Sequence, residues 1–137
     1  MTLATEEFAK LFTTEEANEL IPRLEVLVRK LQASAAQARA RAAAAGPSAN
    51  LEELSRSDPV IRTAMREMSK IAQEIQDLGC FLKDIDLGLV DFPAELNGDT
   101  IFLCWQYGEP RLVAWHPIDE GFSSRKPLPG GPKVYLN

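Results

Sequence analysis

Apolar residues recur along positions 17–45 at alternating steps of four and three, which is the heptad spacing of a long amphipathic helix. The series is Ala17, Ile21, Leu24, Val28, Leu31, Ala35, Ala38, Ala42 and Ala45. Thr13 with Glu16 three residues later is the capping-box pattern that starts a helix, and the Gly-Pro pair at 46–47 is typical of a helix end. We therefore expect one long helix, with a kink or a short separate first turn at Pro22.

A second apolar series follows a short linker, Gly46–Asn50. Its heptad positions are Ile61, Met65, Met68, Ala72 and Ile75. Two starts fit the capping preferences, Leu51 after an asparagine and Pro59 after an aspartate, and the sequence leaves both open. With Gly79 as its end, this helix and the first predict a long antiparallel helical hairpin over about 14–79.

Strand-like segments replace the helical pattern after residue 79. They are Leu87–Phe92, Thr100–Tyr107 and Arg111–His116. Asn97-Gly98 suits a tight turn with positive φ, and 108–110 reads as a short hairpin loop. These segments predict a small antiparallel β-meander of three or four strands.

The residues after Pro117 are rich in proline and glycine and show no periodicity. We expect a tail that wraps the sheet up to Leu128 and is loose at 129–132, with 134–136 as a further edge strand. The predicted fold class is α+β, a single domain over 1–137 in which the helical hairpin packs on the sheet and tail of about 80–137.

Composition narrows the function classes. The 137 residues include 45% hydrophobic and 26% charged residues, as in ordinary globular proteins. A net charge of -5 disfavours nucleic acid as a partner. No apolar run is long enough to cross a bilayer, and acidic Glu6 and Glu7 stand where a signal peptide has basic residues, so we expect a cytoplasmic protein without a membrane partner. Cys80 and Cys104 match no metal-binding spacing and are interpreted as small buried hydrophobes.

Charge is unevenly distributed in the second half of the chain. Between positions 84 and 120 the only Lys or Arg is Arg111, and the acidic residues are Asp84, Asp86, Asp91, Glu95, Asp99, Glu109, Asp119 and Glu120. Beyond them stand Arg125, Lys126 and Lys133. The basic tail either folds back to neutralise the acidic block, which we favour, or leaves a pocket that attracts cations.

His116 and Asp119 lie three residues apart at a strand end, close enough for a hydrogen-bonded pair or for one metal ion. Glu109 or Asp91 would complete such a group. We favour a structural role for His116, tied to Asp119 or to a backbone carbonyl, over ligand binding, acid–base work or metal ligation. No cofactor is favoured. A divalent metal, if present, would take His116, Asp119 and Glu109, and this oxygen-rich set suits manganese or magnesium better than structural zinc.

Four more residues join the candidate ligand-binding set. Trp105 and Trp115 sit on neighbouring strands and are expected in the core. Arg125 is expected to brace Asp91 or Glu109, because a buried carboxylate needs such a partner. Asp91, between two apolar residues of a strand, is expected on the solvent face.

Four segments carry a resemblance to a known family. They are FTTEEANELIPRLEVLV (12–28), DLGLVDFPA (86–94), LCWQYGEP (103–110) and WHPIDEGFSSRKPL (115–128). In these the chain resembles the bacterial family called domain of unknown function 2203 (DUF2203). Positions that look recurrent in it stand here as Asp91, Trp105, Gly108, Glu109, Trp115, His116, Gly121, Phe122 and Arg125. The family name records no activity, so the resemblance implies no catalytic residue.

The sequence names no reaction, and whether the protein is an enzyme stays open. Our favoured hypothesis is a noncatalytic interaction or scaffold module that forms a homodimer through its helical hairpin, because the second helix has a broad apolar face. The alternative is a small-molecule or metal-binding protein whose polar site lies in the C-terminal sheet region.

Overall fold

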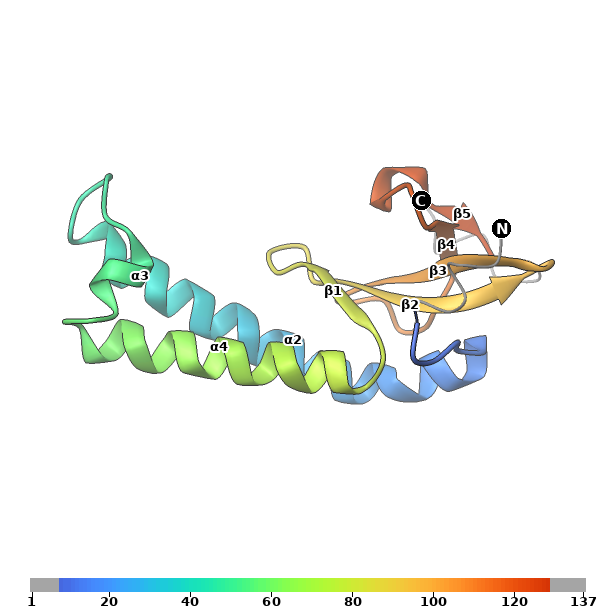
Figure 1. The fold of residues 1–137 in the computed structure, drawn as a ribbon, viewed down its shortest axis with the longest axis horizontal. Coiled ribbons are helices and arrows are strands. Elements are labelled where there is room, and N and C mark those ends of the chain that lie inside the picture. Colours follow the sequence, from blue (N-terminus) through green and yellow to red (C-terminus); the bar gives the residue numbers. More distant parts are fainter. Residues whose placement is uncertain (1–7, 129–137) are drawn as a thin grey trace.

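Two long helices lie beside a five-stranded antiparallel sheet in the computed structural model, which describes residues 8–128 (Figure 1). Helices α2 (Thr14–Ala43) and α4 (Pro59–Asp77) pack along one another and run in opposite directions. The short helix α3 (Leu51–Leu54) lies in the connection between them. The fold class is α+β, as the sequence predicts.

The predicted capping box starts α2. The hydroxyl of Thr13 accepts a hydrogen bond from the Glu16 backbone N–H at 3.1 Å, and the Glu16 carboxylate accepts one from the Thr13 N–H at 2.9 Å. Of the kink or separate first turn expected at Pro22, the separate turn is wrong, because α2 runs as one helix through Pro22. Pro22 is exposed, so its ring does not disturb the buried side of the helix.

Both proposed starts of the second helix are used. The Asn50 side chain accepts hydrogen bonds from the first turn of α3, at 2.8 Å from the Glu52 N–H. The Asp58 side chain accepts one from the Val60 N–H at 3.0 Å and caps α4, with Pro59 as the first helical residue. Two capping signals in succession therefore produce two helices.

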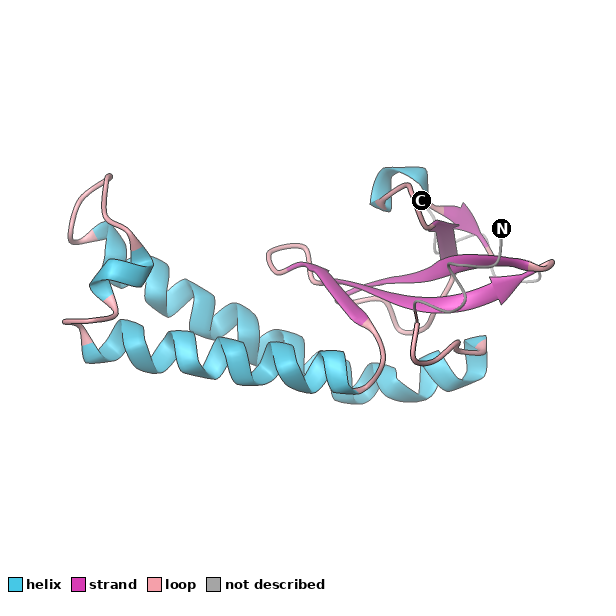
Figure 2. Ribbon diagram, viewed as in Figure 1, coloured by secondary structure: helices cyan, strands magenta, loops and turns pink. Residues whose placement is uncertain are grey.

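The sheet is a meander in which each strand pairs with its neighbours in the chain (Figure 2). Its strands are β1 (Phe81–Asp84), β2 (Leu89–Leu96), β3 (Asp99–Gln106), β4 (Ala114–Pro117) and β5 (Lys126–Pro127). The predicted Asn97-Gly98 turn joins β2 to β3, with φ of 53° and 87°. The sequence missed the short strands β1 and β5, and the expected edge strand at 134–136 and loose stretch at 129–132 lie outside the described residues.

Strand β2 continues past its predicted end at Phe92, through Pro93, to Leu96. The partner strand β1 stops opposite Asp91, so at Pro93 only β3 pairs with β2. The carbonyl of Pro93 accepts a hydrogen bond from the Phe12 N–H at 2.7 Å, which shows that its backbone faces the unpaired side. Proline is tolerated there because no ladder bond needs its missing N–H.

Both faces of the sheet are covered. The helix face packs on α2 and α4 and is apolar; its strand residues are Val90, Phe92, Ala94, Ile101, Leu103 and Trp105. The opposite face, which we call the second face, carries Asp91, Phe102, Cys104 and His116 in the alternate positions. Residues 117–125, called here the cover segment, include a 3-10 turn (Phe122–Ser124) and lie over the second face (Figure 1).

An aromatic group closes the other part of the second face. The ring of Phe8 lies edge-on to the rings of Phe81 and Phe102, with centroid distances of 5.7 and 5.6 Å. The ring of Phe102 in turn contacts the imidazole of His116 at 5.6 Å. No helix within residues 8–128 has the length and apolar character needed to cross a membrane.

We expect Gly88→Ala to destabilise the protein more than Gly98→Ala. Both glycines have positive φ, 67° and 87°, which costs about 1–2 kcal/mol for a residue with a Cβ. At Gly88 an added Cβ would also lie 2.5 Å from the Cβ of Tyr107, whereas at Gly98 it meets nothing within 4 Å. Urea unfolding should show a loss of about 1–2 kcal/mol for Gly98→Ala and about 2–4 kcal/mol for Gly88→Ala. Equal losses would mean that the close approach to Tyr107 is wrong.

Candidate functional site

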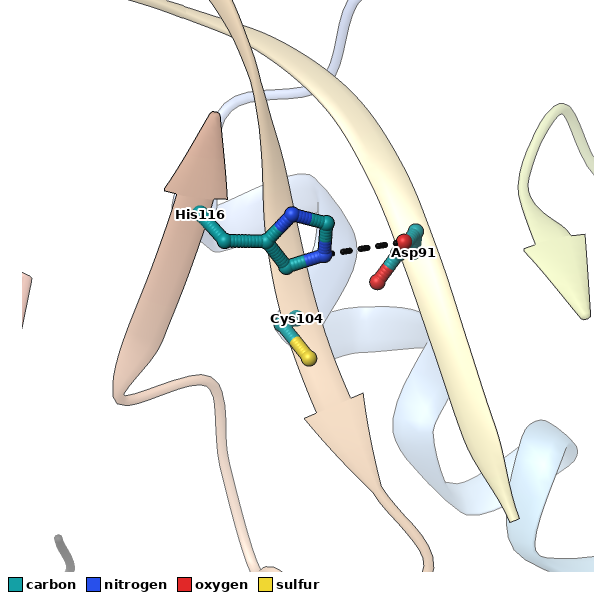
Figure 3. Close-up of side chains that lie close together, drawn as sticks. All are labelled: Asp91, Cys104 and His116. Carbon is teal, nitrogen blue, oxygen red and sulfur yellow. Dashed lines mark hydrogen bonds and ion pairs between the residues drawn. The ribbon is translucent and has the colours of Figure 1, made fainter. Parts of the chain in front are cut away.

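Three polar side chains from adjacent strands meet on the second face (Figure 3). They are Asp91 of β2, Cys104 of β3 and His116 of β4, with exposed fractions of 2%, 1% and 2%. Asp91 and Cys104 are direct cross-strand partners. Backbone pairing therefore sets the position of this group, which does not depend on loops.

His116 uses both ring nitrogens. Its Nε2 lies 3.0 Å from Oδ2 of Asp91, and its Nδ1 lies 2.8 Å from the carbonyl oxygen of Pro117. Since a carbonyl oxygen can only accept, Nδ1 carries a proton and donates a hydrogen bond to the carbonyl of Pro117. Nε2 is left facing the Asp91 carboxylate, which fixes the orientation of the ring.

Lys83 reaches the same carboxylate from the edge strand. Its Nζ lies 3.4 Å from Oδ2 of Asp91 and 4.4 Å from the centre of the Phe102 ring. The register of β1 shifts by one residue between Leu82 and Asp84, which places Lys83 in the irregularity. Such irregularities change the direction in which side chains point, and here the ammonium of Lys83 is directed toward Asp91.

The expectation that Asp91 lies on the solvent face is wrong. The alternation of the strand is as predicted, but the second face is covered, so Asp91 is buried. Its cover comes from Phe8 and the cover segment, which are distant in the chain and have no periodic pattern. A buried carboxylate needs partners to offset the loss of hydration, and His116 and Lys83 provide them.

A pocket of about 100 Å³ lies beside this group. Its lining residues are Lys83, Leu89, Asp91, Cys104, His116, Glu120, Gly121 and Phe122. We call it the second-face pocket. The pocket therefore adjoins the buried Asp91–His116 pair.

Arg125 braces the end of the cover segment. Its Nη2 donates to both carboxylate oxygens of Glu109, at 2.7 and 2.9 Å, and the two side chains are only 14% and 17% exposed. Glu109 also accepts from the Gln106 N–H at 2.8 Å, and its carbonyl accepts from the indole N–H of Trp105. Of the two partners expected for Arg125, the structure selects Glu109.

A single cluster of Glu109, His116, Asp119 and Arg125 is not formed. Glu109 pairs with Arg125, while His116 pairs with Asp91. Asp119 is exposed, because the chain turns after Pro117 and carries it away from the imidazole. The metal set expected from sequence, His116 with Asp119 and Glu109, is thus not brought together.

Neither tryptophan lines the second-face pocket. Trp105 is fully buried on the helix face, as expected for a core residue. Trp115 lies opposite Leu103 on that same face and is half-buried against the core. The tryptophans therefore anchor the sheet on the helices.

Cys104 is the residue that sequence reasoning missed. It is buried, as expected, but beside charged groups. The Asn97-Gly98 turn could have revealed it, because a two-residue turn pairs Leu96 with Asp99 and, counted outward, Asp91 with Cys104. Burial, together with the negative charge of Asp91, raises the pKa of the Cys104 thiol to about 12.

The group does not have the geometry of a nucleophile with its base. In such a site one ring nitrogen of the histidine faces the thiol and the other faces the carboxylate. Here both nitrogens of His116 face oxygen atoms, and the pKa of Cys104 is raised, whereas a nucleophilic cysteine has a lowered pKa. The arrangement is suited to binding.

Two ion pairs of equal length should differ in energy because they differ in burial. Nitrogen and oxygen are 2.7 Å apart in both the Arg125–Glu109 and the Arg39–Asp86 pair, but the latter side chains are 57% and 67% exposed. A double-mutant cycle with Arg125→Met and Glu109→Gln should give a coupling of about 1–3 kcal/mol. The cycle at Arg39 and Asp86 should give less than about 1 kcal/mol. A weaker coupling at Arg125 than at Arg39 would contradict the brace.

Both cysteines should resist thiol reagents in the folded protein. Burial also raises the pKa of the Cys80 thiol to about 12, so at pH 8 both thiols are protonated. Reaction with an aromatic disulfide reagent should be slower in the native protein by roughly a thousandfold than in guanidinium chloride, where the pKa returns to about 8.5. Rapid modification of a native thiol would show that it is not buried as described.

A search of the curated proteins gave no match, and a search of the solved structures also gave none. A family model matches residues 10–128, which include the whole sheet and the site group. The match also agrees with the resemblance seen in the sequence. The chain belongs to the family described as uncharacterized conserved protein (DUF2203).

Proposed function

We propose that this protein binds a small ligand in the second-face pocket. The observation that carries the proposal is that a buried, hydrogen-bonded pair, Asp91 with His116, borders a pocket of about 100 Å³. A pair that served only to brace the fold would be as stable when enclosed by packed side chains. Placing it at a pocket gives its polar atoms access to a ligand.

The size of the pocket restricts the ligand. Pockets for drug-sized molecules occupy roughly 300–1,000 Å³, and a water molecule takes about 30 Å³ of liquid volume. A space of about 100 Å³ holds an ion with a few waters, or a molecule of a few non-hydrogen atoms. Nucleotides and peptides are too large for it.

The charges around the pocket favour a cation or a hydrogen-bond donor. Asp91 and Glu120 contribute carboxylates, and Lys83 is the only Lys or Arg among the lining residues. Asp91 and Glu120 both belong to the acidic block at 84–120. The favoured interpretation of that block holds at Arg125, which folds back onto Glu109, while the lining of the pocket supports the other, a cation-attracting site.

The rival hypothesis, a scaffold that forms a homodimer through α2 and α4, has less support. It requires apolar heptad residues that are exposed on the single chain. The heptad residues of α2 from Ala17 to Ala38 are instead buried against α4 and the sheet. On α4 the heptad residues Ile61 and Ile75 are buried, and Met65, Met68 and Ala72 are partly buried. Among the described residues, the large hydrophobic side chains that are exposed are Val26 and Leu87, and only Val26 belongs to a helix.

A thermal-shift panel tests the proposal. The probes are ammonium, magnesium, manganese, zinc, acetate, carbonate and phosphate. A ligand at a hundredfold excess over its Kd stabilises the folded state by about 2.7 kcal/mol, so at least one probe should raise Tm by several degrees. Asp91→Asn and His116→Gln should lose this rise, each measured against its own ligand-free Tm.

Glu95→Gln is the matched control, because Glu95 is an exposed carboxylate on the same strand as Asp91. It should keep the full rise in Tm. The proposal is wrong if no probe stabilises the wild-type protein, or if Asp91→Asn and Glu95→Gln respond alike.

A further inference from the structure

We infer that Asp91, Cys104 and His116 are the ligands of one zinc ion. The inference rests on the proposed function, because it names the occupant of the second-face pocket. The three side chains come from three adjacent strands and are buried together (Figure 3). One carboxylate oxygen, the Sγ and one ring nitrogen all lie within 4.8 Å of one another.

The donor set selects the metal. Thiolate and imidazole favour zinc and related transition metals, whereas magnesium and calcium require oxygen donors. The sequence had suggested a carboxylate-rich set and hence magnesium or manganese. The structure replaces that set with one sulfur, one nitrogen and one oxygen, which changes the preferred ion to zinc.

The charges also match. An ionised Asp91, a Cys104 thiolate and a neutral His116 carry two negative charges, which a divalent cation balances. On binding, the Cys104 thiol gives up its proton to solvent, the hydrogen bond between Nε2 of His116 and Oδ2 of Asp91 gives up a second proton, and His116 keeps the proton on Nδ1. The resulting buried site is neutral, which avoids the cost of an uncompensated charge in the protein interior.

His116 is oriented as a zinc ligand should be. Metal-binding histidines almost always donate their second ring N–H to a carboxylate or a backbone carbonyl. Here Nδ1 donates to the carbonyl of Pro117 at 2.8 Å, so Nε2, the nitrogen that faces Asp91, is the one that can bind a metal once the proton of its hydrogen bond to Asp91 has left. The orienting contact is therefore already present.

Only small side-chain movements are needed to enclose an ion. With Zn–N and Zn–O bonds of about 2.0–2.2 Å and Zn–S bonds of about 2.3 Å, tetrahedral ligand atoms lie roughly 3.3–3.6 Å apart. Nε2 of His116 and Oδ2 of Asp91 are 3.0 Å apart. Since all three ligand atoms lie within 4.8 Å of one another, a contraction of about 1 Å by the Cys104 sulfur completes the set.

The position of Lys83 shows that the space beside the Asp91 carboxylate accepts a positive charge. Its ammonium lies 3.4 Å from Oδ2 of Asp91, and its side chain is 43% exposed. An incoming zinc ion displaces this ammonium, which swings into solvent at little cost because the chain is long and exposed. The divalent ion then supplies the positive charge that Lys83 gave to Asp91.

Three protein ligands leave the fourth zinc position open, and the second-face pocket lies beside it. Closed structural zinc sites have four protein ligands, whereas sites with three hold water or another small ligand in the fourth position. Glu120 and Gly121 of the cover segment line the same pocket. The site is thus built to hold zinc together with one further small ligand.

The experiment uses the full chain without a histidine tag. Zinc content is measured after purification, and zinc affinity is then measured by competition with a chromogenic chelator. We expect one zinc per chain. Cys104→Ala should weaken binding by more than about 100-fold, since even the loss of an outer contact to a ligand costs roughly 10–100-fold. Cys80→Ala is the matched control, because Cys80 is equally buried but belongs to the apolar core, and it should bind zinc as the wild type does.

Replacing zinc by cobalt gives an absorption band that reports directly on the metal–sulfur bond, so a change in folding alone would not produce or remove it. Cobalt bound to a thiolate absorbs in the near ultraviolet through charge transfer from sulfur. This band should be present in the wild type and in Cys80→Ala and absent from Cys104→Ser, which keeps the size of the side chain. A band that survives in Cys104→Ser would place the metal elsewhere and overturn the inference.

Lys83→Met should bind zinc more tightly than the wild type, because it removes the competing ammonium. Lys126→Met is its control, since Lys126 also lies over an aromatic ring, 5.6 Å from the centre of Trp115, but does not line the pocket. Unchanged or weaker affinity in Lys83→Met would contradict a metal beside Asp91.

The outcomes separate the two proposals. If zinc does not bind but another probe stabilises the protein in an Asp91-dependent manner, the zinc inference is wrong and the proposed function stands. If no probe binds, both are wrong. If zinc binds and depends on Cys104, both are supported.

Discussion

Side-chain alternation along β2 and β3 is the constraint on which the rest of the structure depends. Successive residues of a strand point to opposite sides, so a run in which every residue is buried requires a cover on both sides of the sheet. Such runs extend over 89–94 in β2 and 101–105 in β3. The helices provide one cover, and Phe8 with the cover segment provides the other.

The two covers produce two kinds of interior. On the helix face apolar side chains fill the space, and Trp105 satisfies its one polar atom through the carbonyl of Glu109. On the second face a carboxylate is buried and must be surrounded by donors. The Arg125–Glu109 pair holds the end of the cover segment, and that segment both shields Asp91 from bulk water and forms a wall of the pocket. The brace and the wall of the pocket therefore lie on neighbouring residues of one segment.

Local signals in the sequence were sufficient for much of the fold. The Thr13 capping box, the caps before α3 and α4 and the Asn97-Gly98 turn all depend on residues within a few positions of one another, and all were predicted. The pairing of Arg125 is narrowed to two carboxylates, Asp91 and Glu109, because a buried carboxylate needs a cationic partner. These features need no knowledge of which segments meet in space.

The errors arose where distant segments meet. Asp91 was placed on the wrong side because nothing near it in sequence indicates that residues from both ends of the chain cover the second face. For His116 the sequence predicts Asp119 or a backbone carbonyl as partner; the carbonyl of Pro117 confirms the second, but the carboxylate partner, Asp91, comes from a strand two positions across the sheet. Cys104 was treated as a simple apolar residue because its charged neighbours become visible only when the register of β2 and β3 is applied. Hydrophobic periodicity identifies helices and strands. The residues that meet in a site depend on the register of the strands and on the segments that cover the sheet.

The order of the strands has a consequence for how the chain folds. Because each strand pairs with the next one in sequence, the sheet can assemble through short loops, and each step has a small entropic cost. The packing of α2 on the sheet is different, since α2 and the preceding Phe12, whose N–H donates to the Pro93 carbonyl, are far from the strands along the chain. We therefore expect docking of α2 on the preassembled meander to limit the folding rate. Changes at the helix face, where the docking contacts form, should then slow folding.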